Sequence, residues 1–210
     1  MNSDGIPPDQ QFRTLVGVYP AGGAYDDSSF RNLSGNTAPS EGLQGAGISP
    51  LLLSSYTNFM LAESALTLGT TGDAKIYLEN GMKESFNKVK AFGASVAQTS
   101  TTIPTQADFD AYVVDVMADY DAGDDTQKLK VIVEQYFIAL WGNGIEAYNT
   151  YRRTGQPSDL QPAVDLADPG TFVRSAWYPS NAADNNSNIN QKDDVTQPVF
   201  WDTNSAGFVD

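Results

Sequence analysis

The residue types that most active sites use are missing from this chain. Its 210 residues include no His and no Cys. A Ser-His-Asp triad, a Cys nucleophile, an imidazole metal ligand, a Cys zinc site and a disulfide are therefore excluded. The segment 17–23 is rich in glycine but lacks the Walker lysine and the flanking pattern of a dinucleotide site. No cofactor is expected.

Carboxylates are abundant, with 26 Asp and Glu against 12 Lys and Arg and a net charge of -14. Such a chain is repelled by phosphate backbones, so we expect no nucleic-acid partner. Glycosidases need two carboxylates that face one cleft, and Glu63 with Glu134 or Glu146 is a candidate pair. Because Glu63 lies on an apolar helical stripe, a structural Glu is the favoured interpretation, hydrogen-bonded between helices or paired with Arg152 or Arg153.

Four aspartates form a dense acidic turn: Asp119, Asp121, Asp124 and Asp125. Oxygen ligands at alternating positions can bind Ca²⁺, but an EF-hand also needs Gly at its sixth position and Glu at its twelfth. Neither requirement is met, so a turn that links two helices is favoured. The Asn2-x-Asp4-Gly5 segment could end a similar loop, and an ordinary β-turn is favoured there. No metal site is predicted.

Aromatic side chains in loops are the remaining candidates for ligand binding. The apolar face of a sugar ring packs on an indole or phenol, and a polar rim supplies hydrogen bonds. Binding residues concentrate in loops, and the ligand candidates there are Tyr19, Tyr25, Phe30, Arg31 and Trp177. The other aromatic residues are assigned to structure. Tyr178 and Trp201 are expected to anchor loops, whereas Tyr136, Trp141 and Tyr148 are expected to pack in the helical core.

The elements that must position these side chains are predicted from apolar periodicity. The pattern of residues 49–154 predicts four helices. The first begins at an N-cap, Ser49-Pro50, and the second begins at Asp73. The third begins at a capping pair, Thr105 and Asp108, and the fourth follows the acidic turn. In the same order, the four helices are expected to end at Gly69, at Gly93, near Tyr120 and at Gly155. Gly81 within the second helix is expected to permit close approach of a neighbouring helix. Arg152 and Arg153 occupy the last turn of the fourth helix, where cations complement the helix dipole.

The predicted fold is mostly α, with stacked antiparallel helical hairpins of tetratricopeptide-like geometry and long irregular loops. The consensus residues of that repeat are not evident. We expect a single domain over 1–210, in which a loop-rich segment 1–48 with a brief strand precedes the hairpins of 49–155 and a loop-rich segment 156–210. The N-terminus has no signal-peptide pattern, and no run approaches the roughly 18 apolar residues of a membrane span.

Several segments resemble the SusD/RagB family of surface nutrient-binding lipoproteins. The helical segment Phe59–Ala65 resembles the family helix centred on Ala-Glu-Ala. The run from Ala139 continues to Tyr151-Arg152-Arg153-Thr154-Gly155-Gln156-Pro157, which is similar to the signature aromatic-x-x-Arg-Arg-Thr-Gly-x-Pro. Arg174-Ser175-Ala176-Trp177-Tyr178-Pro179 resembles the Arg-x-x-x-Tyr-Pro segment, and Val199–Asp202 resembles the closing Trp-Asp piece.

The resemblance covers residues 50–210 and corresponds to the C-terminal half of the family. It implies that this chain is the C-terminal part of a longer protein whose lipid-accepting Cys lies elsewhere. The intact protein would be held by its lipid on the extracellular face of the outer membrane, as a lid over a SusC-like TonB-dependent transporter. It would bind an oligosaccharide or another nutrient, deliver it inward and catalyse no reaction. Two alternatives remain, a helical-repeat protein-interaction module and, less favoured, a carboxylate-pair glycosidase.

Overall fold

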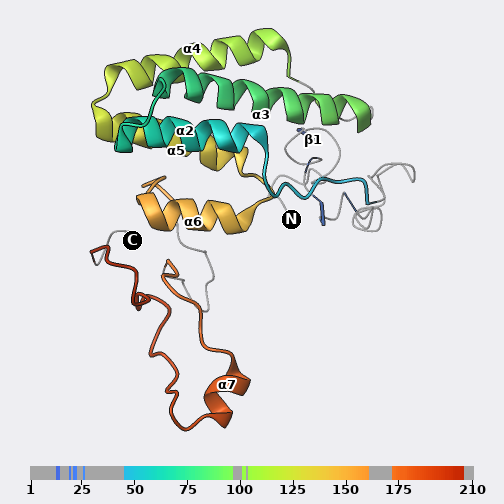
Figure 1. Cartoon of the computed structure of the whole chain (residues 1–210). Coiled ribbons are helices and arrows are strands. Elements are labelled where there is room, and N and C mark those ends of the chain that lie inside the picture. The colour runs from blue at the N-terminus through green and yellow to red at the C-terminus, as the bar shows by residue number, and fades with distance from the viewer. Residues whose placement is uncertain are drawn as a thin grey trace, which may run out of the picture. The chain divides into compact units, whose positions relative to one another are not determined.

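The computed structural model describes residues 13–14, 19, 21–22, 26, 45–96, 101–102, 104–160 and 172–205 (Figure 1). Most of them lie in helices: α2 (Ser54–Leu68), α3 (Ala74–Val96), α4 (Gln106–Ala122), α5 (Asp125–Ala139), α6 (Gly144–Thr154) and α7 (Ser180–Asn185). Two short strands, β1 (Arg13–Thr14) and β2 (Thr101–Thr102), pair in parallel. The predicted mostly helical fold is confirmed, and tetratricopeptide-like geometry is compatible with it.

The chain divides into two compact units, Met1–Ala147 and Tyr148–Asp210, which are described separately. The first unit contains helices α2 to α5, and α6 begins in it and ends in the second. In Figure 1, α2 lies beside α3 and α5, and α4 runs along α3. Among the described helices, none combines the length and apolarity that crossing a membrane would require.

Helix α2 begins later than predicted, and the expected N-cap at Ser49-Pro50 is wrong. Its N-cap is Leu53, which has an extended backbone and makes no side-chain capping bond. The preceding residues are held outside the helix by other partners, because Ile48 bonds to the backbone around Tyr19 and the carbonyl of Leu51 accepts from the Asn143 side chain at 3.1 Å. The end is as expected, since Gly69 adopts the left-handed conformation with φ 64°.

Helix α3 continues past its predicted end at Gly93 and reaches Val96. A glycine inside a helix costs only about 1 kcal/mol. The ring of Phe92 in this last part of the helix packs edge-on against Tyr19, with centroids 5.5 Å apart, and this contact supports the extra turn. The prediction for Gly81 is confirmed, because a Cβ at that position would lie 3.0 Å from the Phe59 ring of α2.

The acidic turn links α4 to α5, as favoured, and its aspartates have local partners. Asp124 caps α5 by accepting from the Gln127 N–H at 3.0 Å, and Asp121 pairs with Lys75 at 2.6 Å. Within the part of the chain that the structure describes, no group of three or more carboxylates is arranged to hold a metal ion. At the other end of α4, the capping box of Thr105 and Asp108 is confirmed.

The predicted fourth helix is two helices, α5 and α6. The break falls at 140–143, where Gly142 has a φ of 93° that side-chain-bearing residues rarely adopt. Asn143 then starts α6, because its side-chain oxygen accepts from the N–H of Glu146 at 3.1 Å. In the second unit, the short helix α7 lies within the segment 156–210 that was expected to be loop-rich, and its first turn closes on the carbonyl of Pro179.

The core of the first unit is rich in aromatic rings. Phe59 stacks on Tyr136 with centroids 5.4 Å apart, and Tyr56 meets Tyr136 edge-on at 5.6 Å. All three side chains are at most 1% exposed. The Tyr136 hydroxyl donates to the Glu146 carboxylate at 3.4 Å, a partly buried polar contact between α5 and α6. Burial raises the pKa of Tyr56 to about 12, and burial followed by the nearby Glu146 charge raises the pKa of Tyr136 as well.

These buried phenols predict a loss of stability at high pH. An unfolded tyrosine ionises near pH 10, whereas folded Tyr56 stays neutral until about pH 12. Their contribution is therefore constant below pH 10 and is lost as pH rises above it, with Tyr56 alone costing about 1 kcal/mol of unfolding free energy at pH 11. Urea denaturation from pH 8 to 11.5 measures this dependence. The double variant Tyr56→Phe, Tyr136→Phe should show a shallower decline, and an equal decline would contradict the assignment.

Candidate functional site

The five predicted ligand residues do not all fall within the described structure. Tyr19 belongs to the first unit and Trp177 to the second. Tyr25, Phe30 and Arg31 lie outside the described residues, so their proposed role stays a prediction. The surroundings of Tyr19 and Trp177 are therefore considered in turn.

Tyr19 is fixed beside the start of the helical region. Its carbonyl accepts from the N–H of Ile48, and the Ile48 carbonyl accepts from the N–H of Ala21, both at 2.9 Å. The Asp26 carboxylate, only 7% exposed, adds a second clamp by accepting from the backbone of Gly22 and Gly47. Sequence reasoning missed this clamp, because the bond to Gly47 joins residues 21 positions apart in the chain.

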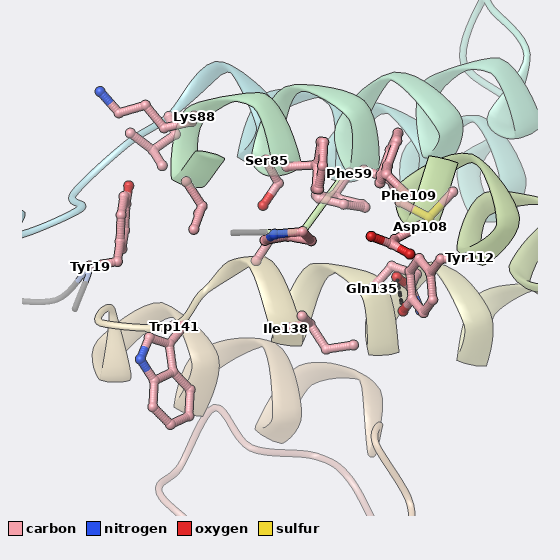
Figure 2. A pocket seen from close by; sticks show the side chains of 16 residues that line it. Tyr19, Phe59, Ser85, Lys88, Asp108, Phe109, Tyr112, Gln135, Ile138 and Trp141 are labelled. Carbon is pink, nitrogen blue, oxygen red and sulfur yellow. Dashed lines mark hydrogen bonds between the residues drawn. The ribbon is translucent and has the colours of Figure 1, made fainter. Parts of the chain in front are cut away.

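A cavity of about 540 Å³ opens beside Tyr19 in the first unit (Figure 2). Tyr19 and Trp141 lie at one end of it, and Phe109, Asp108 and Tyr112 lie at the other. Its described lining is largely apolar and comes from all four helices of the unit: Leu53, Phe59, Met82, Phe86, Val89, Pro104, Phe109, Ile138, Ala139 and Trp141, with Tyr19, Ser85, Lys88, Asp108, Tyr112 and Gln135 as its polar members.

The polar groups at the α4 end of the cavity make hydrogen bonds within the protein. The Tyr112 hydroxyl donates to the Gln135 amide oxygen at 2.8 Å, as Figure 2 shows. The Asp108 carboxylate accepts from the backbone N–H of Thr105 at 2.8 Å and from its hydroxyl at 2.6 Å, and these bonds lower the Asp108 pKa. One carboxylate oxygen of Asp108 and the amide NH2 group of Gln135 take no part in these bonds.

The candidate carboxylate pair does not face this cavity. Among the described lining residues, Asp108 is the single carboxylate. Glu146 instead accepts from Tyr136, and Glu134 forms an ion pair with Lys130 at 3.4 Å on the surface of α5. Glu63 is half-buried and has an interaction partner. The structure thus assigns structural surroundings to Glu134 and Glu146, and the described cavity wall lacks the two facing carboxylates of a glycosidase.

The interpretation of Trp141 as a core residue is wrong. It follows the end of α5, is 54% exposed and lines the cavity. Periodicity placed Trp141 on the apolar face of one long helix, but the chain leaves the helical conformation before Trp141, which therefore does not lie on that face. Tyr136 is buried as expected. Tyr148 belongs to the second unit and is 36% exposed, and its hydroxyl donates to the Val173 carbonyl of the same unit at 2.5 Å.

In the second unit, an ion-pair network joins α6 to the C-terminal segment. Arg174, which is 6% exposed, donates through Nε to Asp202 at 3.1 Å and through its two terminal nitrogens to the carbonyls of Ser205 and Asn204. Arg152 donates to the same Asp202 carboxylate at 3.2 Å. Burial acts to raise the pKa of Asp202, but the hydrogen bonds from Arg174, Asn204 and Arg152 outweigh it and lower that pKa.

Trp177 lies in a loop that is pinned on both sides. Before it, the Ser175 hydroxyl donates to the Gln197 carbonyl and accepts from the Lys192 ammonium, each at 2.5 Å. After it, Tyr178 is held by the Gln191 side chain, which accepts from its N–H at 3.1 Å and donates to its carbonyl at 2.9 Å. The Trp177 ring is nevertheless 50% exposed. A fixed backbone with an exposed indole is the arrangement of a preorganised stacking surface.

The expectation that Trp201 and Tyr178 anchor loops through their rings is wrong. Trp201 is 65% exposed and Tyr178 is 45% exposed. The anchoring is done by their neighbours, because Asp202 pairs with Arg174 and Arg152, and the Gln191 side chain holds the Tyr178 backbone. Sequence patterns place these anchors next to the aromatic residues but cannot say which of two adjacent side chains turns inward.

A family model described as "Susd and RagB outer membrane lipoprotein" matches residues 33–202. The chain belongs to this family. The predicted resemblance is therefore confirmed, and the structure explains part of its motif pattern. Arg152 of the Arg-Arg-Thr-Gly-x-Pro segment, Arg174 of the Arg-x-x-x-Tyr-Pro segment and Asp202 of the Trp-Asp piece meet in one network.

Solved structures with the same fold include other SusD-like proteins. A SusD homologue of Bacteroides fragilis is 19% identical with a TM-score of 0.58, and the match covers 74% of this chain and 35% of that one. A chitin-binding protein is 27% identical with a TM-score of 0.53, with coverage of 72% and 33%. An outer membrane protein of Bacteroides vulgatus, named for a link to nutrient binding, is 27% identical with a TM-score of 0.50, with coverage of 66% and 29%.

This SusD-like chain spans about a third of the length of the solved structures it matches. A comparison with curated proteins finds no match. The comparisons therefore identify the family and the fold.

Proposed function

We propose that this SusD-like protein binds a glycan or another nutrient at the cell surface without changing it chemically. The observation that carries the proposal is the family match over residues 33–202, which extends from the helical hairpins to the pinned loop of the second unit. A structural neighbour named as a chitin-binding protein supports a glycan as the ligand class. Chitin oligosaccharides are therefore the first ligands to test.

Trp177 is the best-supported stacking residue among the described candidates. Its ring is half exposed, and the hydrogen bonds of Ser175 and Tyr178 fix the backbone on both sides of it. Binding to a loop that is already ordered avoids the entropy cost of ordering it. Gln191 and Lys192, which bond to Tyr178 and Ser175, each keep further N–H donors that could reach sugar hydroxyls. Tyr19, Tyr25, Phe30 and Arg31 remain further candidates.

We further propose that the protein works on the extracellular face of the outer membrane. The matching family is described as outer membrane lipoproteins, which supports a lipid anchor as the means of attachment. A protein that binds a nutrient there needs a transporter to carry it inward, and a SusC-like TonB-dependent transporter is the proposed partner. The carboxylate-pair glycosidase and the protein-interaction module are less well supported, because neither follows from the family match.

Replacing Trp177 with Ala tests the stacking role. We expect the affinity of the chain for a chitin oligosaccharide to fall about tenfold or more, because a central exposed aromatic ring typically dominates such a contact and tenfold corresponds to about 1.4 kcal/mol. Isothermal titration calorimetry measures the change. The matched control is Phe200→Ala, which removes a ring that is 94% exposed in the same unit and should leave the affinity unchanged. Equal affinities for wild type and Trp177→Ala would exclude Trp177 from the site.

A further inference from the structure

We propose that Lys192 and Gln191 make the Trp177 loop (residues 175–178) selective for glycans whose sugar units carry a carbonyl-type oxygen, as an acetamide or a carboxylate does. The sugar packs against the ring of Tyr178, the residue that follows Trp177, and its substituent meets the Lys192 ammonium. The inference rests on the proposed glycan binding by this loop and adds the ligand chemistry that the loop prefers.

Tyr178 offers a sugar an exposed ring on a fixed backbone. Its side chain is 45% exposed, and the Gln191 side chain bonds to its N–H and its carbonyl at 3.1 and 2.9 Å. The Lys192 ammonium lies 5.2 Å from the centroid of the ring, within the range of a cation–π contact. A sugar unit that packs against the exposed part of the ring on this side therefore has its substituents next to the ammonium.

The free hydrogen-bonding groups of Gln191 and Lys192 are all donors. The Gln191 amide oxygen already accepts from the backbone N–H groups of Tyr178 and Lys192, at 3.1 and 3.0 Å. The Gln191 NH2 group donates one hydrogen to the Tyr178 carbonyl and keeps the other. The Lys192 ammonium donates to Ser175 and keeps two N–H groups. The two side chains thus offer a ligand three N–H donors, whereas both lone pairs of their one acceptor are in use.

Lys192 carries a positive charge without a close counter-ion in the described part of the chain. No described carboxylate lies within the 4.0 Å of an ion pair with its ammonium. The two aspartates that follow it bond elsewhere, since Asp193 accepts from the Gln197 side chain and Asp194 accepts from the N–H and the hydroxyl of Thr196. The charge of Lys192 is therefore available to a ligand oxygen.

These donors discriminate between sugars by what each substituent can accept. A hydroxyl brings an O–H donor together with its acceptor oxygen, and Gln191 and Lys192 have no free acceptor for that donor. An acetamide or carboxylate oxygen accepts without needing an acceptor in return at that atom. Its bond to an ionised donor such as Lys192 is about twice as strong as a bond between neutral groups. Acetylated or acidic sugar units are therefore preferred over units that carry hydroxyls alone.

The test compares three hexasaccharides with the same β-1,4 linkage. The N-acetylglucosamine and glucuronate hexamers carry a carbonyl-type oxygen on each unit, and the glucose hexamer carries hydroxyls alone. Isothermal titration calorimetry of the 210-residue chain should give at least one of the first two a Kd about tenfold or more below that of the glucose hexamer. The tighter of the two identifies whether the oxygen belongs to an acetamide or to a carboxylate.

Three variants locate the preference at the Lys192 ammonium. Lys192→Met keeps the apolar stem and removes the ammonium, so the preference over the glucose hexamer should fall to about threefold or less. Ser175→Ala removes the partner of Lys192 but leaves its donors, so it should keep the preference even where it lowers every affinity. Lys83→Met makes the same charge change at an exposed lysine of the first unit and should alter neither the affinities nor the preference.

Three results would overturn the proposal. They are a glucose hexamer that binds as tightly as both substituted hexamers, a Lys192→Met variant that retains the wild-type preference, and a Ser175→Ala variant that loses the preference as fully as Lys192→Met does. Hexasaccharides still bind in each of these cases, so the proposed glycan function would stand. A failure of all three hexamers to bind would instead count against the glycan function together with this inference.

Discussion

Phe59→Ala is expected to lower the free energy of unfolding of the helical unit by about 3–5 kcal/mol, the usual cost of removing a fully buried phenyl ring. Phe59 is 1% exposed, stacks on Tyr136 of α5 at 5.4 Å and lies against Gly81 of α3. One side chain thus joins three helices. The closely packed backbone at Gly81 limits how far the surroundings can collapse into the space, which places the cost toward the upper part of that range.

Urea denaturation followed by helical circular dichroism measures this loss. The control is Leu68→Ala on the same helix, whose side chain is 77% exposed and whose removal should change the free energy of unfolding by no more than about 0.5 kcal/mol. A loss below about 1 kcal/mol for Phe59→Ala would show that this ring is not central to the packing of α2, α3 and α5.

Arg174→Ala should have the second-largest effect, this time on the second unit. The side chain is 8% exposed, and its guanidinium pairs with Asp202 at 3.0 Å and donates to two backbone carbonyls. Removing it leaves the carbonyls of Asn204 and Ser205 without this donor and leaves Arg152 as the remaining cation on Asp202. Breaking a buried pair by deleting one partner costs about 3–5 kcal/mol. We therefore expect residues 172–205 to become sensitive to protease.

Limited proteolysis with mass spectrometry locates the new cleavage sites. Arg174→Lys keeps the charge but cannot supply the planar fork that reaches a carboxylate and two carbonyls, so it should give an intermediate sensitivity. The control Lys130→Ala breaks the exposed pair with Glu134, which is worth only about 0.3–0.5 kcal/mol, and should leave the cleavage pattern unchanged. If Arg174→Ala resists cleavage as wild type does, the network does not hold the segment.

Local patterns predicted the parts of the fold that depend on neighbouring residues. The capping box at Thr105 and Asp108, the helix end at Gly69 and the acidic link between α4 and α5 each involve residues within one or two helical turns. The break at Gly142 was missed because it lies within an apolar run that keeps helical periodicity on both sides. A glycine in such a run can lie inside a helix or end it, and only the structure shows that Gly142 has the positive φ that ends it.

The surroundings of the candidate site residues depend on contacts between segments that are far apart in the chain. Such contacts cannot be predicted from the local pattern of a single sequence. Asp26 clamps Gly47, and Arg174 pairs with Asp202, across long stretches of chain. Which aromatic side chains remain exposed is decided by these contacts, so Trp141 and Trp201 were assigned to the wrong environment. Trp177 was named correctly as a loop residue, and its pinned backbone is what the structure adds.

The family motifs acquire a physical meaning in this structure. Arg152 of the Arg-Arg-Thr-Gly-x-Pro segment reaches Asp202, and Arg174 completes the pairing. The two residues of the Trp-Asp segment have different surroundings, since Asp202 pairs with Arg174 and Arg152 while Trp201 stays exposed beside Phe200, with ring centroids 4.7 Å apart.

The most direct test of the central claim is to titrate the purified chain with chitin hexasaccharide and then recover the sugar. We predict a saturable change in tryptophan fluorescence and recovery of intact hexasaccharide after prolonged incubation, because a binding protein holds its ligand and releases it unchanged. Other oligosaccharides tested in the same way would define the preferred glycan. The absence of saturable binding to every glycan tested, or recovery of shorter sugars, would contradict non-catalytic glycan binding by this chain.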